Sequence, residues 1–161
     1  MQRRFVLLGA SVLLAAPGAA FAQAQSGASM PARFAAALNA HDIDAFAALF
    51  ADDYVNHQMS AAAPPPPAGA SQKAATVAFF AARLKGLPDL KVSIETMVEQ
   101  DDRAGASYVY EGAHEGLYFG VAPTGKRLRF TSCDIFRVAG GRIAEHWGMG
   151  DIAGVLAQLK G

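Results

Sequence analysis

Asp134 is the residue whose type and position point most directly to chemistry. The segment from Lys126 to Trp147 predicts two strands joined by a tight turn. Alternate side chains of a strand share one face, and those that share it with Asp134 are mostly apolar: Leu128, Phe130, Ser132, Phe136 and Val138. A carboxyl group withdrawn from water holds its proton more readily, as a general acid or base near neutral pH requires. The structural alternative is an aspartate that caps backbone amides or pairs with an arginine across the sheet.

A second row of candidates lies on one face of segment 107–116, where Tyr108, Tyr110 and His114 alternate. A histidine beside tyrosines can orient a substrate carbonyl group or carry a proton. Packing in the core or along a cavity wall is the alternative for these residues. We expect the row to lie near Asp134.

Four further residues are candidates for substrate contacts. His146 and Trp147 point to opposite faces; Trp147 is expected in the core, whereas small neighbours leave room beside His146 for a ligand or another side chain. Asn56 and His57 precede four prolines at 64–67, so we expect them at a cavity mouth. The predicted substrate-binding set is Asn56, His57, Tyr108, Tyr110, Phe130, Phe136, His146 and Trp147.

Other kinds of site have little support in the sequence. The histidines lack His-x-His or His-x-x-x-His spacing, so we predict no metal site. Motifs for phosphate cradling and nucleophile elbows are missing as well. The net charge of +0 and the scattered basic residues argue against nucleic acid as a partner.

The elements that must position these residues predict an α+β fold. Apolar residues recur at a helical period in 30–54, with a break at 39–42, and again in 72–86 and 151–161. Residues 54–59 predict a short extended segment. Alternating residues and turn signals between 90 and 150 predict an antiparallel meander of four or more strands. We expect the N-terminal helices to wrap the curved antiparallel sheet into a cone with an internal cavity, followed by a C-terminal helix.

The N-terminal segment predicts export. Arg3 and Arg4 precede a short apolar run, and the residues up to Ala22 match a small-x-small cleavage site. Phe5 follows the arginines directly, where a twin-arginine signal usually has a spacer, so we favour the general secretory route. The run is too short to span a bilayer, so no membrane association is expected after cleavage. The predicted location is periplasmic or secreted.

The predicted organisation has three parts. Residues 1–22 form the signal peptide, 23–30 a flexible lead and 31–161 a single cone domain. Of these 161 residues 52% are hydrophobic, which is enough for one sizeable core. The single cysteine, Cys133, cannot form an internal disulfide, and we expect it to be a small buried residue.

Several motifs together resemble the SnoaL-like polyketide cyclase family, also called ester cyclases, of the nuclear transport factor 2 superfamily. They are "YVNHQ", the run "GAHEGLYFGVAPTGKRLRF", an aspartate in the next strand, and "GRIAEHW". The resemblance covers roughly residues 33–159. It implies a cone of helices on a curved sheet, no cofactor, and a homodimer through the convex surface. It also implies ring closure by intramolecular aldol condensation, with Asp134 and His114 as catalytic residues and the "NH" pair, Asn56 and His57, holding the substrate.

Three functions are open on this basis. The first is a cofactor-independent cyclase, isomerase or lyase that acts on a small apolar carbonyl compound, with Asp134 as the base. A hydrolase that activates water in the same cavity is a variant of it. The second is a periplasmic protein that binds a small ligand without chemistry. The third is a structural role in which side chains fill the cavity.

Overall fold

The computed structural model describes residues 28–58 and 68–161. The predicted signal peptide at 1–22, residues 23–27 of the predicted lead and the prolines at 64–67 lie outside the described residues. The first described helix begins at Met30, one residue before the predicted start of the domain. No helix in the described part of the chain has the length and apolar character needed to cross a membrane.

Helices and strands follow each other as expected for an α+β protein. The helices are α2 (Met30–Asn39), α3 (Ile43–Ala48), α4 (Gln72–Gly86) and α5 (Ile152–Lys160). The strands are β1 (Phe50–Asn56), β2 (Lys91–Gln100), β3 (Arg103–Ala113), β4 (Arg127–Ala139) and β5 (Arg142–Gly150).

Each helix in the described part of the chain begins where a short polar side chain accepts a hydrogen bond from a backbone N–H three residues ahead. The capping residues are Ser29, Asp42, Ser71 and Asp151. Such caps satisfy one of the free donors of the first turn. The caps predicted for the second, third and last helices from the sequence are therefore confirmed.

The five strands form one curved sheet in the order β1-β5-β4-β3-β2. The last four strands pair antiparallel, as predicted. β1 instead pairs parallel with β5. The prediction of a helix reaching Tyr54 is therefore wrong: α3 ends at Ala48, because the edge of β5 offers hydrogen-bond partners to the following residues. Ile143, for example, donates its N–H to the carbonyl of Leu49 at 2.7 Å.

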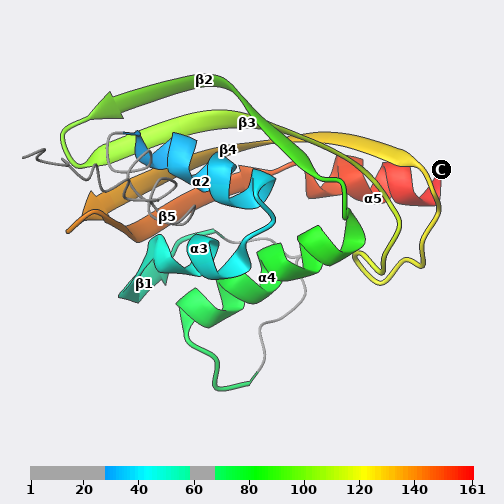
Figure 1. Cartoon of the computed structure of the whole chain (residues 1–161), viewed down its shortest axis with the longest axis horizontal. Coiled ribbons are helices and arrows are strands. Elements are labelled where there is room, and N and C mark those ends of the chain that lie inside the picture. Colours follow the sequence, from blue (N-terminus) through cyan, green and yellow to red (C-terminus); the bar gives the residue numbers. More distant parts are fainter. Residues whose placement is uncertain (1–27, 59–67) are drawn as a thin grey trace, which may run out of the picture.

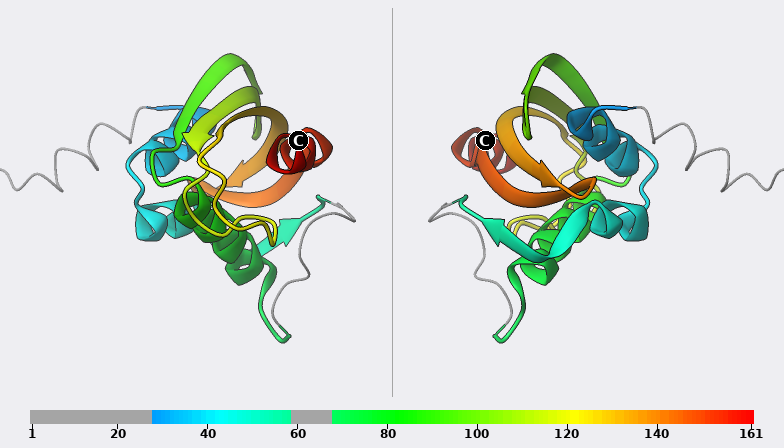
Figure 2. Two further views of the ribbon diagram at one scale, coloured as in Figure 1. Left: turned by 90° about the vertical axis from the view of Figure 1, so that its right-hand side faces the viewer. Right: turned by 90° about the vertical axis from the view of Figure 1, so that its left-hand side faces the viewer.

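The sheet arches over the helices, so its concave face encloses the core. Figure 1 shows α2 under the arch, α3 and α4 below it, and α5 at one side. The two turned views show how strongly the strands curl around these helices (Figure 2). Phe34 of α2 lies at the centre. Its ring contacts the rings of Phe46, Phe80, Tyr108 and Phe136 at centroid distances of 5.1–5.4 Å.

The convex face carries an outer apolar patch, made of Val98, Cys133, Ile135, Trp147 and Met149. Val98, Ile135 and Trp147 occupy one register row across the sheet, and Cys133 lies beside Met149 in the next row. Met149 is 78% exposed. Cys133 is also exposed, so the prediction of a buried cysteine is wrong. Its side chain points to the face that no described helix covers.

Candidate active site

Asp134 lies in the middle of β4 on the concave face and is 4% exposed. Its Oδ1 is 2.7 Å from Nε2 of His146 on β5, and its Oδ2 accepts a hydrogen bond from the Ser132 hydroxyl at 2.5 Å. Both carboxylate oxygens therefore have a partner inside the protein. A buried carboxylate without such partners would be very costly.

Two small residues make room for this pair. In the sheet register, Asp134 lies between Ala106 of β3 and Gly148 of β5. A Cβ atom on Gly148 would lie 2.6 Å from Oδ1 of Asp134 and 2.7 Å from Nε2 of His146. The sequence predicted room for a ligand or another side chain beside His146, and the side chain of Asp134 occupies it.

His146 continues the network toward β1. Its Nδ1 is 3.1 Å from the hydroxyl of Tyr54. Thr76 of α4 donates to that hydroxyl at 3.4 Å, and the side-chain amide of Asn56 donates to Thr76 at 3.4 Å. One chain of hydrogen bonds therefore runs from the partly buried Asn56 to the buried carboxylate.

All hydrogen bonds of this series can run in the same direction from donor to acceptor. In the tautomer with hydrogen on Nε2, His146 donates a hydrogen bond to Asp134 and its Nδ1 accepts one from Tyr54. The Tyr54 hydroxyl in turn accepts a hydrogen bond from Thr76. Burial raises the pKa of Tyr54 above the usual tyrosine value, and the nearby Asp134 charge adds to this effect. Tyr54 therefore stays a donor throughout the neutral range. The arrangement holds Asp134 ready to accept a proton.

A buried arginine lies near Asp134 on the helical side. Arg83 of α4 is 6% exposed, and its Nε donates to the Tyr118 hydroxyl at 3.0 Å. Its guanidinium carbon lies 4.7–5.2 Å from the centroids of four rings: Phe79, Phe80, Tyr110 and Phe130. No carboxylate of the described residues forms an ion pair with Arg83.

A small crevice leads to this region between α5 and the loop after β3. Its walls include Arg83, Tyr118, Phe119, Phe130, Ser132, Ile152 and Val155. Its free volume is about 10 Å³, close to what one water molecule occupies. Ser132 is the residue that both lines the crevice and contacts Asp134. The predicted internal cavity is thus narrow here, because aromatic side chains fill most of the cone.

Most of the predicted site residues do gather around Asp134. Phe136 packs on the ring of His146 at 5.1 Å, and Phe130 stacks on Tyr110 at 5.1 Å. The Tyr110 hydroxyl lies 3.4 Å from that of Ser132, whereas the Tyr108 hydroxyl donates to the carbonyl of Pro31 at 3.3 Å. Asn56 joins the group through Thr76.

His114 is not brought together with Asp134. Ala106, the register partner of Asp134 on β3, precedes His114 by eight residues, or roughly 25 Å of extended chain. His114 is fully buried at the other end of the strand, where Nδ1 accepts the backbone N–H of Thr124 at 3.2 Å. Its backbone also pairs with Lys126 and Gly125. These contacts give His114 a role in holding the loop 114–126.

His57 and Trp147 lie on the convex side, away from Asp134. Strand alternation places Trp147 on the face opposite His146, and His57 stacks on its ring at 4.5 Å. His57 also contacts Glu145 at 2.8 Å, and Arg137 contacts the same carboxylate. Hydrogen bonds from His57 and then Arg137 lower the pKa of Glu145 below its usual value. Neither predicted substrate contact lies beside the buried carboxylate.

Tyr54, Thr76 and Arg83 belong to the site but were missed from the sequence. Tyr54 was placed at the junction of the predicted helix and a short extended segment, and its alternation with Asn56 on one strand face was not used. Thr76 and Arg83 share the apolar stripe of α4 with Phe79 and Phe80. A single arginine on an otherwise apolar stripe was the signal that could have identified Arg83.

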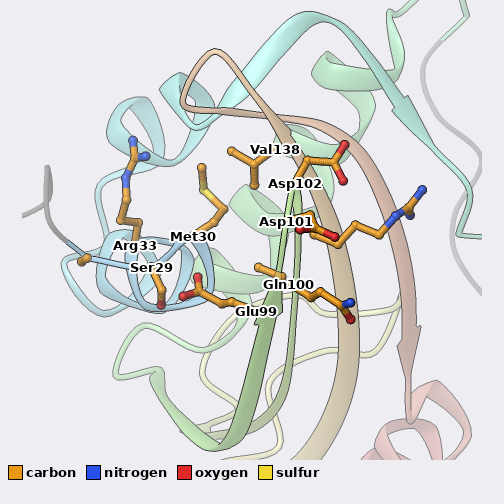
Figure 3. Close-up of a pocket in the computed structure, with 11 residues that line it drawn as sticks. Ser29, Met30, Arg33, Glu99, Gln100, Asp101, Asp102 and Val138 are labelled. Carbon is orange, nitrogen blue, oxygen red and sulfur yellow. The ribbon is translucent and has the colours of Figure 1, made fainter.

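A wider cleft lies at the opposite end of the sheet. It has a volume of about 360 Å³ and is lined by the start of α2, the β2–β3 turn and Val138 (Figure 3). None of the residues of the Asp134 network lines it. Among the described residues, no group of three or more His, Cys, Asp or Glu side chains has a metal-binding arrangement.

The family model of the SnoaL-like polyketide cyclases matches residues 29–159. This chain belongs to that family. The match runs from the cap of α2 to Leu159 in α5. It confirms the resemblance drawn from the motifs. No curated protein matches the chain.

Solved structures agree with this membership. The chain is similar to IdmH from Streptomyces antibioticus, described as a proposed polyketide cyclase, with 28% identity over 82% of this chain and 96% of that one, and a TM-score of 0.68. TsrD from Streptomyces laurentii is 25% identical, with coverages of 86% and 95% and a TM-score of 0.68. A protein with a ketosteroid isomerase-like fold from Catenulispora acidiphila, 20% identical with coverages of 82% and 92%, shares the fold at a TM-score of 0.62. The prediction of a polyketide cyclase-like enzyme is confirmed at the level of the family.

Proposed function

We propose that this protein is an exported, cofactor-independent acid–base enzyme of the cyclase, isomerase or lyase type that acts on a small apolar carbonyl compound. The observation that carries the proposal is the buried pair of Asp134 and His146, whose side chains are 6% and 1% exposed. Such a pair inside an aromatic core has the composition needed to remove a proton next to a carbonyl group. Family membership supports the same class of reaction.

In this proposal Asp134 is the base. It takes the proton from the carbon next to the carbonyl, while His146 keeps the carboxylate oriented through the 2.7 Å hydrogen bond. The electron pair left on carbon moves to the carbonyl oxygen, which needs a hydrogen-bond donor. The Ser132 hydroxyl already donates its hydrogen to Asp134, so the nearby donor is the hydroxyl of Tyr110, 3.4 Å from that of Ser132. In this proposal Tyr110 has the donor role for which His114 and Tyr108 were the candidates from the sequence.

The test is proton exchange catalysed by the purified protein. A panel of aryl ketones and 1,3-diketones is incubated in D₂O, and loss of the α-proton signal is followed by NMR. The wild type should accelerate exchange, and Asp134→Asn should slow it by about 10²- to 10⁴-fold, the usual contribution of a general base. The matched control is Asp52→Asn, which makes the same chemical change at a carboxylate that is 87% exposed.

Exchange that is equally fast in Asp134→Asn would contradict the assignment of the base. Saturable ligand binding without exchange or product would favour the binding protein. Oxygen-18 incorporation from water into the product would favour the hydrolase. The thermal midpoint of Asp134→Asn must also be measured, because the substitution removes the charged partner of the buried His146 and can lower the stability of the protein.

Export belongs to the same proposal and rests on the N-terminal sequence. Expression of the whole chain in a bacterium, followed by fractionation and mass spectrometry, should give a periplasmic protein that begins at Gln23. An intact N-terminus in the cytoplasmic fraction would contradict it.

A further inference from the structure

Arg83 is a buried charge that the acid–base network does not use. At 6% exposure it has lost nearly all of its water, and its polar contact among the described residues is the bond from Nε to the Tyr118 hydroxyl. A buried guanidinium normally pairs with a carboxylate, because desolvation of a charge is costly. Within the described ranges 28–58 and 68–161, no such ion pair is present.

The surroundings of Arg83 leave the fork of its guanidinium available. Four aromatic rings face the cation, which compensates part of the lost hydration without using its N–H groups. The hydrogen bond that Arg83 makes to a described residue comes from Nε, and Nη1 and Nη2 are not among the fully buried atoms that lack a partner. Arg83 also lines the crevice that opens between α5 and the loop after β3.

We propose that Arg83 binds the carboxylate of the substrate, so that the substrate class is a small carboxylic acid with an apolar body that carries the reacting carbonyl group. This inference rests on the proposed function and names its substrate more closely. A guanidinium fork matches a carboxylate by two parallel hydrogen bonds, which a neutral group cannot reproduce.

The shape of the crevice agrees with this assignment. Space for about one water molecule lies beside Arg83, which suits a small anionic group rather than a ring. The apolar body of the ligand then lies outside this space, beside Phe119, which lines the crevice and is partly exposed. Ser132 also lines the crevice and donates a 2.5 Å hydrogen bond to Asp134, so the crevice lies one residue away from the base.

In this proposal the charges of Arg83 and Asp134, which are opposite in sign, act on different ends of the same substrate molecule. The Asp134 carboxylate is close enough to act on the charge of Arg83 but does not form an ion pair with it. A bound carboxylate neutralises Arg83 and leaves Asp134 free to accept a proton. The binding step therefore depends on Arg83, and the proton transfer depends on Asp134.

The test is a comparison of benzoate with benzamide, which has the same shape without the charge. Calorimetric titration of the purified protein should give saturable benzoate binding that is about 10- to 100-fold tighter than benzamide binding, the range for hydrogen bonds between charged groups. Arg83→Gln should remove this preference and leave benzamide binding unchanged. Arg83→Lys keeps the charge but loses the fork, so benzoate binding should be intermediate.

Asp134→Asn separates this proposal from the proposed function. It removes a nearby negative charge, so it should bind benzoate at least as tightly as the wild type although α-proton exchange is lost. Equal affinity for benzoate and benzamide, or no saturable benzoate binding, would overturn the assignment of Arg83 whatever the exchange assay shows. If Arg83→Gln fails to fold, Arg83→Lys decides: benzoate affinity equal to the wild type would overturn it.

Discussion

At the scale of residues, the feature that matters is a carboxylate that accepts two hydrogen bonds inside an aromatic core. Asp134 receives one from His146 and one from Ser132, and His146 is held in turn by Tyr54. Each donor fixes the orientation of the next group, so little rearrangement is needed when a proton moves. The position of Asp134 exists only because its neighbours on both adjacent strands, Ala106 and Gly148, are small.

Substitution of Gly148 gives a testable prediction at the scale of residues. Gly148→Ala places a methyl group where Oδ1 of Asp134 and Nε2 of His146 lie, so the pair must separate or shift. We expect α-proton exchange to fall by at least about 10-fold and stability to fall by about 1–3 kcal/mol, the range for overpacking. Exchange kinetics and denaturant unfolding measure the two effects.

The control for this variant is Gly105→Ala on β3. There a new Cβ would meet its nearest atom, on Ile135, at the ordinary distance of 3.5 Å. Gly105 faces the convex side, so both exchange and stability should stay near wild type. Equal activity of the Gly148→Ala and wild-type proteins would show that the observed contact between Asp134 and His146 is not required.

At the scale of elements, β1 decides how the site is completed. It brings Tyr54 and Asn56 to the concave side of β5, while His57 follows it onto the convex side. There Glu145 contacts His57 and Arg137, and so links the end of β1 to β5 and β4. His57 and Trp147 therefore serve the packing of strands in this structure.

The pH dependence of Glu145 tests this structural role. Its pKa is lowered in the folded protein, first by the hydrogen bond from His57 and then by that from Arg137. The stabilisation is therefore present above the usual glutamate pKa of 4.5 and disappears as the pH falls through the lower folded value. Glu145→Gln should lower the thermal midpoint by a few degrees at pH 7, because exposed ion pairs contribute little.

The thermal midpoints of Glu145→Gln and of the wild type should become equal at acidic pH. Glu111→Gln is a suitable comparison, since Glu111 pairs with Arg129 at a longer 3.4 Å on a more exposed surface. A difference that persists unchanged at pH 3 would contradict an electrostatic origin.

At the scale of the whole molecule, the convex face is the surface that no described helix covers. Its outer apolar patch contains Ile135, which is 45% exposed, and Met149, which is 78% exposed. Side chains of this kind in one place on a sheet favour association. We propose that two copies pair through this patch, as the resemblance to the family implies.

Ile135→Asp tests the dimer. The substitution places a charge at the centre of the outer apolar patch, and two copies would bring these charges together at a desolvated interface. Light scattering after size exclusion should show a dimer for the wild type and a monomer for the variant. Val55→Asp is the control, because Val55 is 37% exposed on β1 and outside the patch. A monomeric wild type would contradict the proposal.

The sequence by itself determined the presence of the helices, the caps of three of them and the antiparallel strands, because periodicity and capping are local properties. It also placed Asp134 on an apolar face and left room beside His146. Only the tertiary structure decided which groups meet. The parallel pairing of β1 with β5, which brings Tyr54 to His146, and the approach of α4, which brings Arg83 under the sheet, join residues far apart in the chain. The same limit explains the error about His114. Sharing a strand face with Tyr108 fixes the face to which the His114 side chain points, but the length of β3 sets its distance from Asp134.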